Sequence, residues 1–367
     1  MTAHKKFKIG LSIFWLICGI ASCSSSTDQE FKIVEGRLQM IDSVVIQDEN
    51  FQFGSIYHPK IFNDTILGFA DGTFTGISLF NARTGAYITN FETDSIDSYV
   101  IPYQNYTQFS IDRDSVFIMN NMNSTVYEFD LKKNYINNIE LDFNNIRSRP
   151  FFMGNFERKG NRFYVTPYFD GAGLNELFLN APSVSVFDLE GNHLYDFGRY
   201  PEDYLEGKLV LSNYESKIIK GDKMYIINAA GKLVLKEYSL DGNLTQSYNL
   251  LSDHFDPTIG FYTDDPFEAP LTDQVNGLAT DQNADDKTFY ITYTSFDTRD
   301  REFGLKTFRW MLMKVDLENK SIKEFELADN WYIDELTELV AQVKNDTVSI
   351  LIREPDEKLY LKRLIFD

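Results

Sequence analysis

Short apolar runs recur along the whole chain, and each begins directly after a polar turn. The runs are rich in β-branched and aromatic residues and are bounded by Asp, Asn, Gly and Lys, which is typical of β-strands. Helical periodicity is scarce by comparison. A first repeated element, a polar turn joined to an apolar segment, occurs at Asp64–Leu67, Asp114–Phe117, Asn161–Tyr164, Asp222–Tyr225, Lys287–Tyr290 and Asp346–Ser349.

A second element follows each copy of the first and consists of an aromatic or aliphatic residue, usually with Asp after it. Its copies are Phe80-Asn81, Phe129-Asp130, Phe187-Asp188, Tyr238-Ser239, Val315-Asp316 and Phe366-Asp367. Two hairpins repeated six times predict an all-β fold, a six-bladed β-propeller. In this register the first element opens the second strand of a blade, and the second element ends the third strand.

The repeat is uneven in length. Successive anchors at Ile66, Val116, Phe163, Met224, Phe289 and Val348 are separated by 50, 47, 61, 65 and 59 residues. The extra residues fall between the second and third strands of blades 3 and 5, and in the crossover from blade 4 to blade 5. All three insertions belong to one face of a propeller. Because loops on a rigid scaffold commonly carry function, this face is the predicted binding face.

The two ends of the chain are expected to close the ring. The sequence stops where blade 6 would turn into its fourth strand, while an alternating segment, Arg37–Ile46, has no partner at the N-terminus. Pairing these ends would remove exposed strand edges. Asp334–Lys344 has apolar residues at helical spacing, but its place in the repeat predicts the inner strand of blade 6.

The first thirty residues predict export. A basic head with Lys5, Lys6 and Lys8 precedes an apolar run, Ile9–Ile20, which is too short to span a membrane comfortably. Ile20-Ala21-Ser22-Cys23 then resembles the lipobox of bacterial lipoproteins, which implies a signal peptide over 1–22, lipidation of Cys23 and a tether over 23–30. An ordinary signal peptide with a chance Cys is the alternative. By the same resemblance, Ser24 favours the outer membrane, with the domain at 31–367 either periplasmic or surface-exposed.

Charge and cysteine content narrow the range of partners. Removing the three signal lysines leaves 32 Lys and Arg against 55 Asp and Glu, a formal charge of −23. Such a protein repels nucleic acid and anionic lipid, so its contact with the membrane is expected through the lipid alone. Cys18 and Cys23 are the only cysteines, and the exported domain would hold neither disulfide nor free thiol. We expect a monomer.

Signatures of catalysis are mostly absent from the sequence. There is no G-x-S-x-G elbow, phosphate-binding glycine loop or H-E-x-x-H motif. The candidate ligand-binding residues are therefore polar, aromatic and basic side chains on the predicted binding face, since Tyr, Trp and Arg dominate binding hot spots. They are Tyr168, Asp170, Tyr200, Tyr204, His254, Tyr262, Asp264, Asp265, Arg299, Arg301 and Trp310. Surface exposure of His254 and blade packing by Trp310 are the structural alternatives.

Carboxylates in the same insertions leave a calcium site open. Asp253, Asp256, Asp264, Asp265 and Asp297 are among them, and calcium prefers several oxygen ligands. No D-x-D-x-D-G pattern is present, however, and clustering by chance is expected in so acidic a chain. The expectation is no cofactor, with calcium as the alternative.

The chain resembles the six-bladed, TolB-like propeller lipoproteins of uncharacterised function. The resemblance rests on Cys23, on the pattern Val184–Gly191, echoed at Leu235–Gly242, and on length. Where some relatives carry Gly-Pro-Gly-Glu-Tyr, this chain has Gly198-Arg199-Tyr200-Pro201-Glu202-Asp203-Tyr204. These motifs are structural, so the resemblance assigns no catalytic residue.

Two classes of function follow from these patterns. The first is a lipid-anchored, non-enzymatic binding or scaffold module of the cell envelope, whose partner is an envelope protein or a saccharide or peptide ligand. The second is a calcium-dependent propeller hydrolase or lactonase. A ring of Asp, Asn and Glu at the starts of the inner strands would favour the second, but the sequence does not locate those starts.

Overall fold

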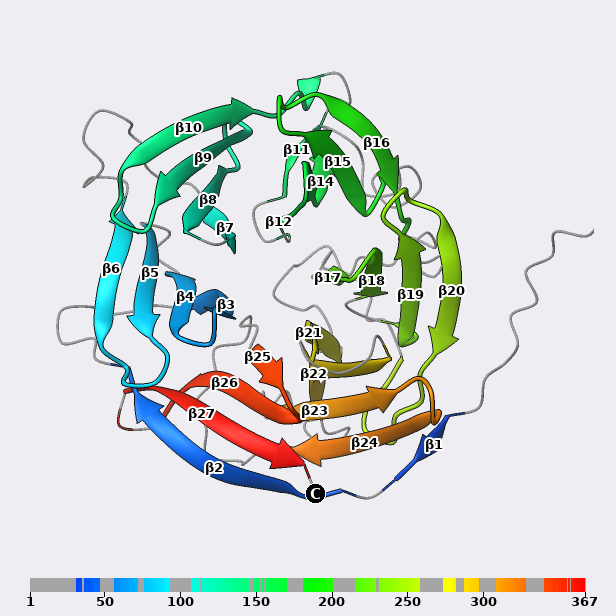
Figure 1. Ribbon diagram of the computed structural model, residues 1–367. Helices are drawn as coiled ribbons and strands as arrows, with labels where there is room; N and C mark the ends of the chain where they lie inside the picture. The colour runs from blue at the N-terminus through cyan, green and yellow to red at the C-terminus, as the bar shows by residue number, and fades with distance from the viewer. Residues whose placement is uncertain are drawn as a thin grey trace, which may run out of the picture.

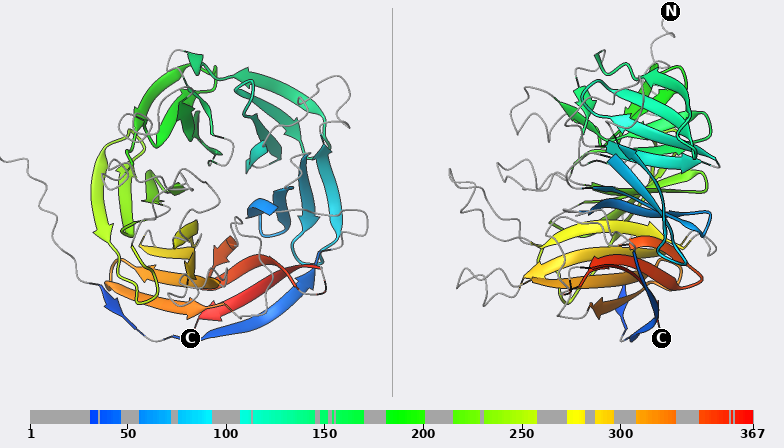
Figure 2. Two further views of the ribbon diagram at one scale, coloured as in Figure 1. Left: turned by 180° about the vertical axis from the view of Figure 1, so that it is seen from behind. Right: turned by 90° about the vertical axis from the view of Figure 1, so that its left-hand side faces the viewer.

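The computed structural model is an all-β ring of six blades, with no α-helix in the part of the chain that it describes (Figure 1). It describes residues 31–34, 36–46, 56–71, 76–92, 107–112, 114–144, 148–151, 154, 156–169, 181–200, 215–228, 231–257, 273–281, 287–296, 308–327, 340–354, 356 and 358–366. The blades are arranged side by side around one central axis, as the views from behind and from the side show (Figure 2). The predicted fold class is confirmed.

Blades 1 to 3 are four-stranded antiparallel sheets, numbered from the axis outward. Blade 1 contains β3 (Ile56–Phe62), β4 (Ile66–Asp71), β5 (Gly76–Asn81) and β6 (Tyr87–Glu92). Blade 2 contains β7 (Thr107–Asp112), β8 (Ser115–Asn120), β9 (Thr125–Asp130) and β10 (Tyr135–Glu140). Blade 3 contains β12 (Phe156–Lys159), β13 (Arg162–Val165), β15 (Val184–Asp188) and β16 (His193–Phe197).

Blades 4 to 6 follow the same order. Blade 4 contains β17 (Glu215–Lys220), β18 (Lys223–Asn228), β19 (Val234–Ser239) and β20 (Leu244–Asn249). Blade 5 contains β21 (Gln274–Thr280), β22 (Thr288–Phe296), β23 (Phe308–Asp316) and β24 (Ser321–Glu326). Blade 6 contains β25 (Val340–Lys344), β26 (Thr347–Arg353), β27 (Leu359–Phe366) and the N-terminal β2 (Leu38–Val45).

The two ends of the chain close blade 6 as predicted. β2 pairs antiparallel with β27, from Leu38 opposite Phe366 to Val45 opposite Tyr360. The inner strand predicted within 334–344 is present as β25. Two features were not predicted: β1 (Lys32–Ile33) adds a parallel fifth strand to β24 of blade 5, and β11 (Ser148–Pro150) pairs with β14 (Pro167–Phe169) beside blade 3.

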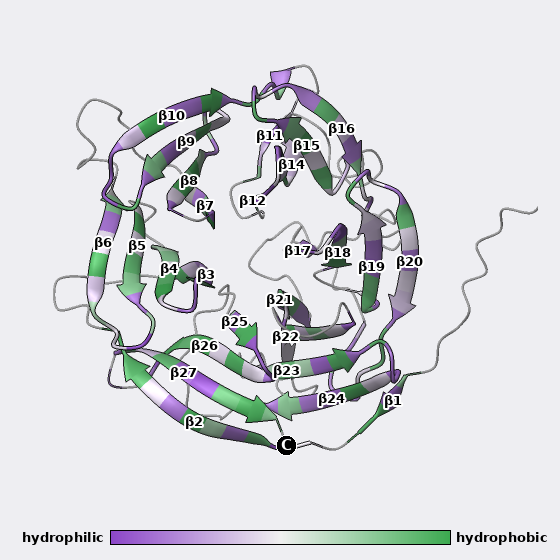
Figure 3. Cartoon of the chain, in the orientation of Figure 1, coloured by the Kyte–Doolittle hydropathy of each residue, from purple (hydrophilic) through white to green (hydrophobic). Residues whose placement is uncertain are grey.

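Both repeated sequence elements lie where the register places them. The first opens the second strand of every blade, and the second ends the third strand. Aromatic members such as Phe80, Phe129 and Phe187 are fully buried, and burying such a side chain stabilises the fold by roughly 1.5–3 kcal/mol. An apolar cluster lies between each pair of neighbouring blades, including blades 6 and 1. The outer strands β10 and β20 carry mostly hydrophilic or intermediate residues, with a few hydrophobic ones among them (Figure 3).

The Asp of the second element has a structural role in the turn that follows it. Asp188 Oδ1 accepts hydrogen bonds from the backbone N–H groups of Glu190 at 3.0 Å and Asn192 at 2.8 Å. Asp130 and Asp316 hold their turns in the same way. The hydrogen bond from the Asn134 side chain, together with those from the backbone N–H groups, keeps the pKa of Asp130 below its ordinary value. This use of a short acidic side chain is typical of turns, so the repeated Asp is no sign of a ligand site.

The blades present two different faces. The turn face carries the connections between first and second strands and between third and fourth strands. The loop face carries the remaining connections, including the three insertions. On the turn face, charged pairs join neighbouring blades: Lys344 with Asp64, Arg158 with Asp112, and Lys314 with Asp346. These ion pairs link neighbouring blades of the ring. The charged residues that form them on the turn face therefore have a structural role.

Candidate functional site

Buried polar side chains gather where strands of blades 3 and 4 meet the loop face. We call Thr166, Ser183, Glu215, Lys217 and Asn228 the interblade polar cluster. Each is at most 5% exposed. Thr166 and Ser183 come from blade 3, at the end of β13 and just before β15, and the other three come from β17 and β18 of blade 4. Buried polar groups are costly unless hydrogen-bonded, so this cluster requires an explanation.

Strand alternation directs Glu215 and Lys217 towards blade 3. Residues two apart in a strand share a face, and Ile219, the next on that face, packs against the apolar cluster between blades 3 and 4. Asn228 lies directly opposite Glu215 in the β17–β18 register. The fold thus delivers one carboxylate, one ammonium and one amide to the same side of blade 4.

Glu215 is the most unusual member of the cluster. Its side chain is buried, and neither carboxylate oxygen accepts a hydrogen bond from any residue that the structure describes. The pKa of Glu215 is raised, mainly by burial, while the charges of Lys217 and Lys236 oppose the shift. The Ser183 hydroxyl is near enough to favour the ionised form, but its geometry falls outside that of a hydrogen bond.

Lys217 is held by blade 3. Its Nζ donates to Thr166 Oγ1 at 2.7 Å. Burial lowers the pKa of Lys217 to about 8, and the nearby charge of Glu215 limits that shift. Thr166 is itself fixed from behind, because a Cβ at Gly154 would lie only 2.4 Å from Thr166 Cβ. A positive charge is therefore positioned beside the unpartnered carboxylate.

Two neighbours of Glu215 also have unused hydrogen-bonding capacity. Among the described residues, Asn228 Oδ1 has no hydrogen-bond donor, and the Ser183 hydroxyl has no hydrogen-bond partner. Gly198, with φ of +75°, lies so close to Ser183 that an added Cβ would be 2.7 Å from Ser183 Cβ. Close backbone packing thus keeps these groups together while their hydrogen-bonding capacity stays unused.

The cluster continues towards the β11–β14 ribbon. Phe151 donates its backbone N–H to the Thr166 carbonyl at 2.8 Å, and its own carbonyl accepts Gln108 Nε2 at 2.6 Å. The ring of Phe151 stacks on Tyr168 with centroids 5.7 Å apart. Tyr168, a residue predicted from sequence, is thus joined to the cluster through Phe151 and Thr166.

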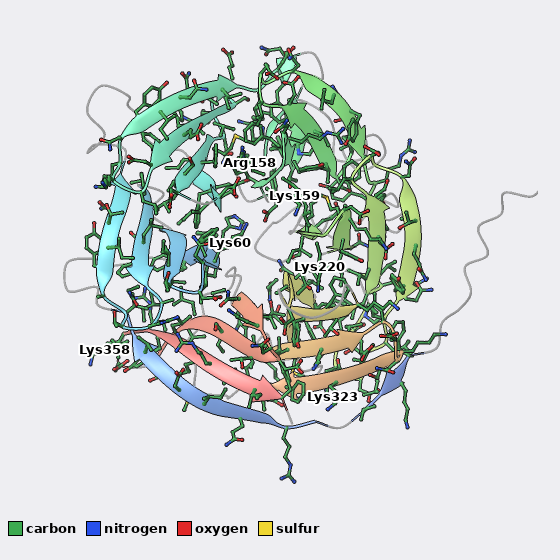
Figure 4. The ribbon with its side chains drawn as sticks, viewed as in Figure 1. Lys60, Arg158, Lys159, Lys220, Lys323 and Lys358 are labelled. Carbon is green, nitrogen blue, oxygen red and sulfur yellow. The ribbon has the colours of Figure 1, made fainter. Side chains whose placement is uncertain are left out.

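The inner strands near the axis are comparatively basic. Lys60, Arg158, Lys159 and Lys220 lie around the centre of the ring, whereas Lys323 and Lys358 lie further out (Figure 4). Lys60 of blade 1 forms an ion pair with Glu157 of blade 3 at 2.6 Å, and Lys220 Nζ donates to the Asp281 carbonyl at 2.9 Å. Most of this charge is engaged within the protein, so the axis is a weaker candidate than the interblade polar cluster.

The other predicted site residues have separate environments. Tyr200 is 8% exposed at the end of blade 3, and His254 is exposed on the crossover after blade 4. Trp310 is 5% exposed within the apolar cluster between blades 5 and 6, so its ring serves blade packing, which was the structural alternative. Cys23, Asp170, Tyr204, Tyr262, Asp264, Asp265, Arg299 and Arg301 lie outside the described residues.

The beginning of the long crossover is anchored on blade 5. The Tyr293 hydroxyl donates to Glu324 Oε1 at 2.6 Å, and the backbone N–H of Asp253 donates to Glu324 Oε2 at 3.1 Å. Ser252 also donates to Glu324, and Ser295 Oγ donates to the His254 carbonyl at 2.5 Å. These bonds explain the position of His254 through its backbone, without assigning a role to its imidazole.

The alternative calcium site finds no ligand group in this part of the protein. Among the described residues, no three His, Cys, Asp or Glu side chains lie close enough to hold a metal ion. The inner strands begin with Ile56, Thr107, Phe156, Glu215, Gln274 and Val340. Only one of these six is acidic, so the first described residues of the inner strands do not form the acidic ring that would favour the calcium hydrolase.

The similarity of this protein to known proteins is confined to its fold. No family model matches the chain, and no curated protein matches it in sequence. A DUF4221 family member from Bacteroides vulgatus has a similar structure, with a TM-score of 0.65, 10% identity, and coverage of 91% of this chain and 99% of that one. A candidate exported protein from Bacteroides fragilis gives a TM-score of 0.55 at 9% identity, covering 92% and 100%. The protein is therefore a six-bladed β-propeller whose structural neighbours include proteins of unassigned function.

The centre of the interblade polar cluster lies outside the set of residues predicted from the sequence. Glu215, Lys217 and Asn228 were not among the predicted residues, although opposite charges at alternate positions, Glu215 and Lys217, directly before Ile218-Ile219 were a usable signal. The start of the fourth inner strand could not be located, because residues 201–214 before it show no repeat element.

Proposed function

We propose that this propeller is a binding module whose ligand site lies on the loop face, at the interblade polar cluster. The observation that carries the proposal is the buried Glu215 carboxylate, whose two oxygens accept no hydrogen bond from the described residues. Leaving a buried acceptor unused costs about 1–3 kcal/mol, and more for a charged group. A bound ligand that donates to Glu215 would offset that cost.

The arrangement suits binding better than catalysis. The usual hydrolytic mechanisms need a nucleophile with an adjacent base, or a metal-bound water. The Thr166 hydroxyl lies 2.7 Å from Lys217 Nζ, but it accepts a hydrogen bond from that ammonium, and an ammonium that donates in this way is not acting as a base. The calcium-dependent hydrolase or lactonase remains the second candidate, supported only by the acidic insertions. Melting the protein with calcium and with a chelator separates the two: the binding proposal expects equal melting temperatures, and a loss of several degrees in chelator would favour the hydrolase.

A thermal-shift screen tests the proposal. Neutral saccharides, amines, carboxylates and short peptides would be screened against the wild type, Glu215→Gln and Glu140→Gln. Glu140 is an exposed carboxylate on β10 and serves as the matched control. We expect compounds of one class to raise the melting temperature of the wild type and Glu140→Gln but not of Glu215→Gln. The absence of any stabilising compound, or equal stabilisation of all three proteins, would contradict the proposal.

We further propose that the module is anchored in the cell envelope by lipid on Cys23. The basic head, the short apolar run and the lipobox-like Ile20–Cys23 support this, as does the description of one structural neighbour as a candidate exported protein. No helix in the described part of the chain is long and apolar enough to cross a membrane. Cys23→Ser is expected to move the protein from the membrane fraction to the soluble fraction, and its retention in membranes would contradict the anchor.

A further inference from the structure

The interblade polar cluster contains more unused hydrogen-bond acceptors than donors. Glu215 provides two carboxylate oxygens and Asn228 one amide oxygen, and all three are buried without a donor among the described residues. Asn228 and Glu215 face each other across the β17–β18 ladder, where cross-strand side chains lie about 5 Å apart. A ligand that satisfies this site must therefore bring several donors to one place.

Charge restricts the ligand further. Lys217 shares its face of β17 with Glu215, and their charges interact. A cationic ligand donating to Glu215 would approach the Lys217 ammonium, and an anionic ligand accepting from Lys217 would approach the carboxylate. Each approach brings like charges together in a buried place, where repulsion is stronger than in water. A neutral ligand avoids both penalties.

Hydroxyl groups meet these requirements because each can donate one hydrogen bond and accept others. Adjacent hydroxyls on one ring could donate to Glu215 and Asn228 and accept from Lys217 or from Ser183, whose hydroxyl has no partner among the described residues. We infer, on the basis of the proposed binding function, that the interblade polar cluster recognises a neutral saccharide through adjacent hydroxyls donating to Glu215 and Asn228.

The neighbouring residues agree with a polyhydroxylated ligand rather than a purely apolar one. The bond to Thr166 holds the Lys217 ammonium in place, and Arg149 lies 5.2 Å from the centroid of the Tyr168 ring. Tyr168 is thus flanked by Arg149 and by the stacked Phe151. The residues next to Thr166 thus include a guanidinium, a phenol and an aromatic ring, a combination of polar and ring groups that suits sugar hydroxyls and C–H faces.

Isothermal titration with the full-length mature protein tests this inference. The probes are neutral oligosaccharides of hexoses, pentoses and N-acetylhexosamines, together with spermidine and a trilysine peptide. We expect at least one oligosaccharide to bind, and Glu215→Gln to weaken its affinity about tenfold or more, which corresponds to losing one hydrogen bond to a charged group. Glu140→Gln should bind as the wild type does.

Each other outcome has a defined meaning. Binding of spermidine or trilysine without saccharide binding overturns the saccharide inference but leaves the proposed binding function in place. Saccharide binding that Glu215→Gln does not weaken also overturns the inference, because the sugar would then bind elsewhere. No binding of any oligosaccharide at millimolar concentration overturns it as well, and the broader thermal-shift screen then decides separately whether the loop face binds anything. The melting temperature of Glu215→Gln establishes that this variant is folded.

Discussion

Lys217 in blade 4 donates a hydrogen bond to Thr166 in blade 3, with 2.7 Å between Nζ and Oγ1. The bond joins two blades at the loop face and fixes the ammonium beside Glu215. The position of the Lys217 ammonium in blade 4 therefore depends on Thr166 in blade 3. The energetic value of this contact can be measured by changing Thr166, because that residue is uncharged and buried.

Thr166→Val should lower the free energy of unfolding by about 1–3 kcal/mol, because a buried ammonium loses a hydrogen-bond acceptor. Thr166→Ser keeps the oxygen and is the matched control, with a smaller loss from the missing methyl group. Urea unfolding of the three proteins measures the difference. Equal stability of Thr166→Val and wild type would show that the Lys217 contact contributes little.

Gly85 is expected to be critical for seating the N-terminal strand. Its φ is +70°, and an added Cβ would lie 1.8 Å from the Val45 carbonyl oxygen at the end of β2. Gly160 has a comparable φ of +58° with nothing within 4 Å of an added Cβ, so Gly160→Ala reports the backbone strain alone. Gly85→Ala should be the more destabilised of the two and should speed hydrogen exchange in β2. Similar losses in both variants would contradict this role.

Closure between blades 6 and 1 should depend on apolar packing more than on charge. Leu67 is fully buried in the cluster shared by these blades, so Leu67→Ala should cost about 2–5 kcal/mol. Asp64, paired with Lys344, is partly exposed, and Asp64→Asn should cost at most about 1 kcal/mol because water and salt screen such pairs. Urea unfolding checks both values, and the reverse order of losses would contradict the expectation.

The sequence predicted the architecture because the repeat reports on strand geometry. Phe80 and Phe187 mark blade packing, and Asp130 and Asp188 mark turns, so the ring and its closing strand followed from local patterns. The pairing of β1 with β24 could not be predicted, since two residues carry no periodicity. The site was harder to predict for a different reason. Glu215 and Thr166 are 49 positions apart, and their proximity depends on how two blades meet rather than on any local motif.

The site residues predicted from the sequence were also chosen without knowledge of their neighbours in space. Tyr168 lies beside the interblade polar cluster, because the inserted segment of blade 3 begins there. Trp310 was selected by residue type, but its neighbours in space are Tyr290 and Leu312 of the core. Residue type indicates what a side chain can do, whereas burial and neighbours decide whether it does so.

The pH dependence of the melting temperature of Glu215→Gln, measured on extensively dialysed protein, tests whether the buried Glu215 carboxylate is a ligand-binding group. The folded-state pKa of Glu215 is raised above its ordinary value of 4.5, so the folded protein binds this proton more tightly than the unfolded chain. The protonated Glu215 side chain therefore favours the folded wild type. This contribution to the free energy of unfolding is fully present below about pH 4.5 and is lost as the pH rises through the folded-state pKa. Gln cannot ionise. We expect Glu215→Gln to melt higher than wild type at neutral pH, with a difference that shrinks towards pH 4. A variant that melts lower at neutral pH would show that the carboxylate is a structural group and would contradict the proposed site.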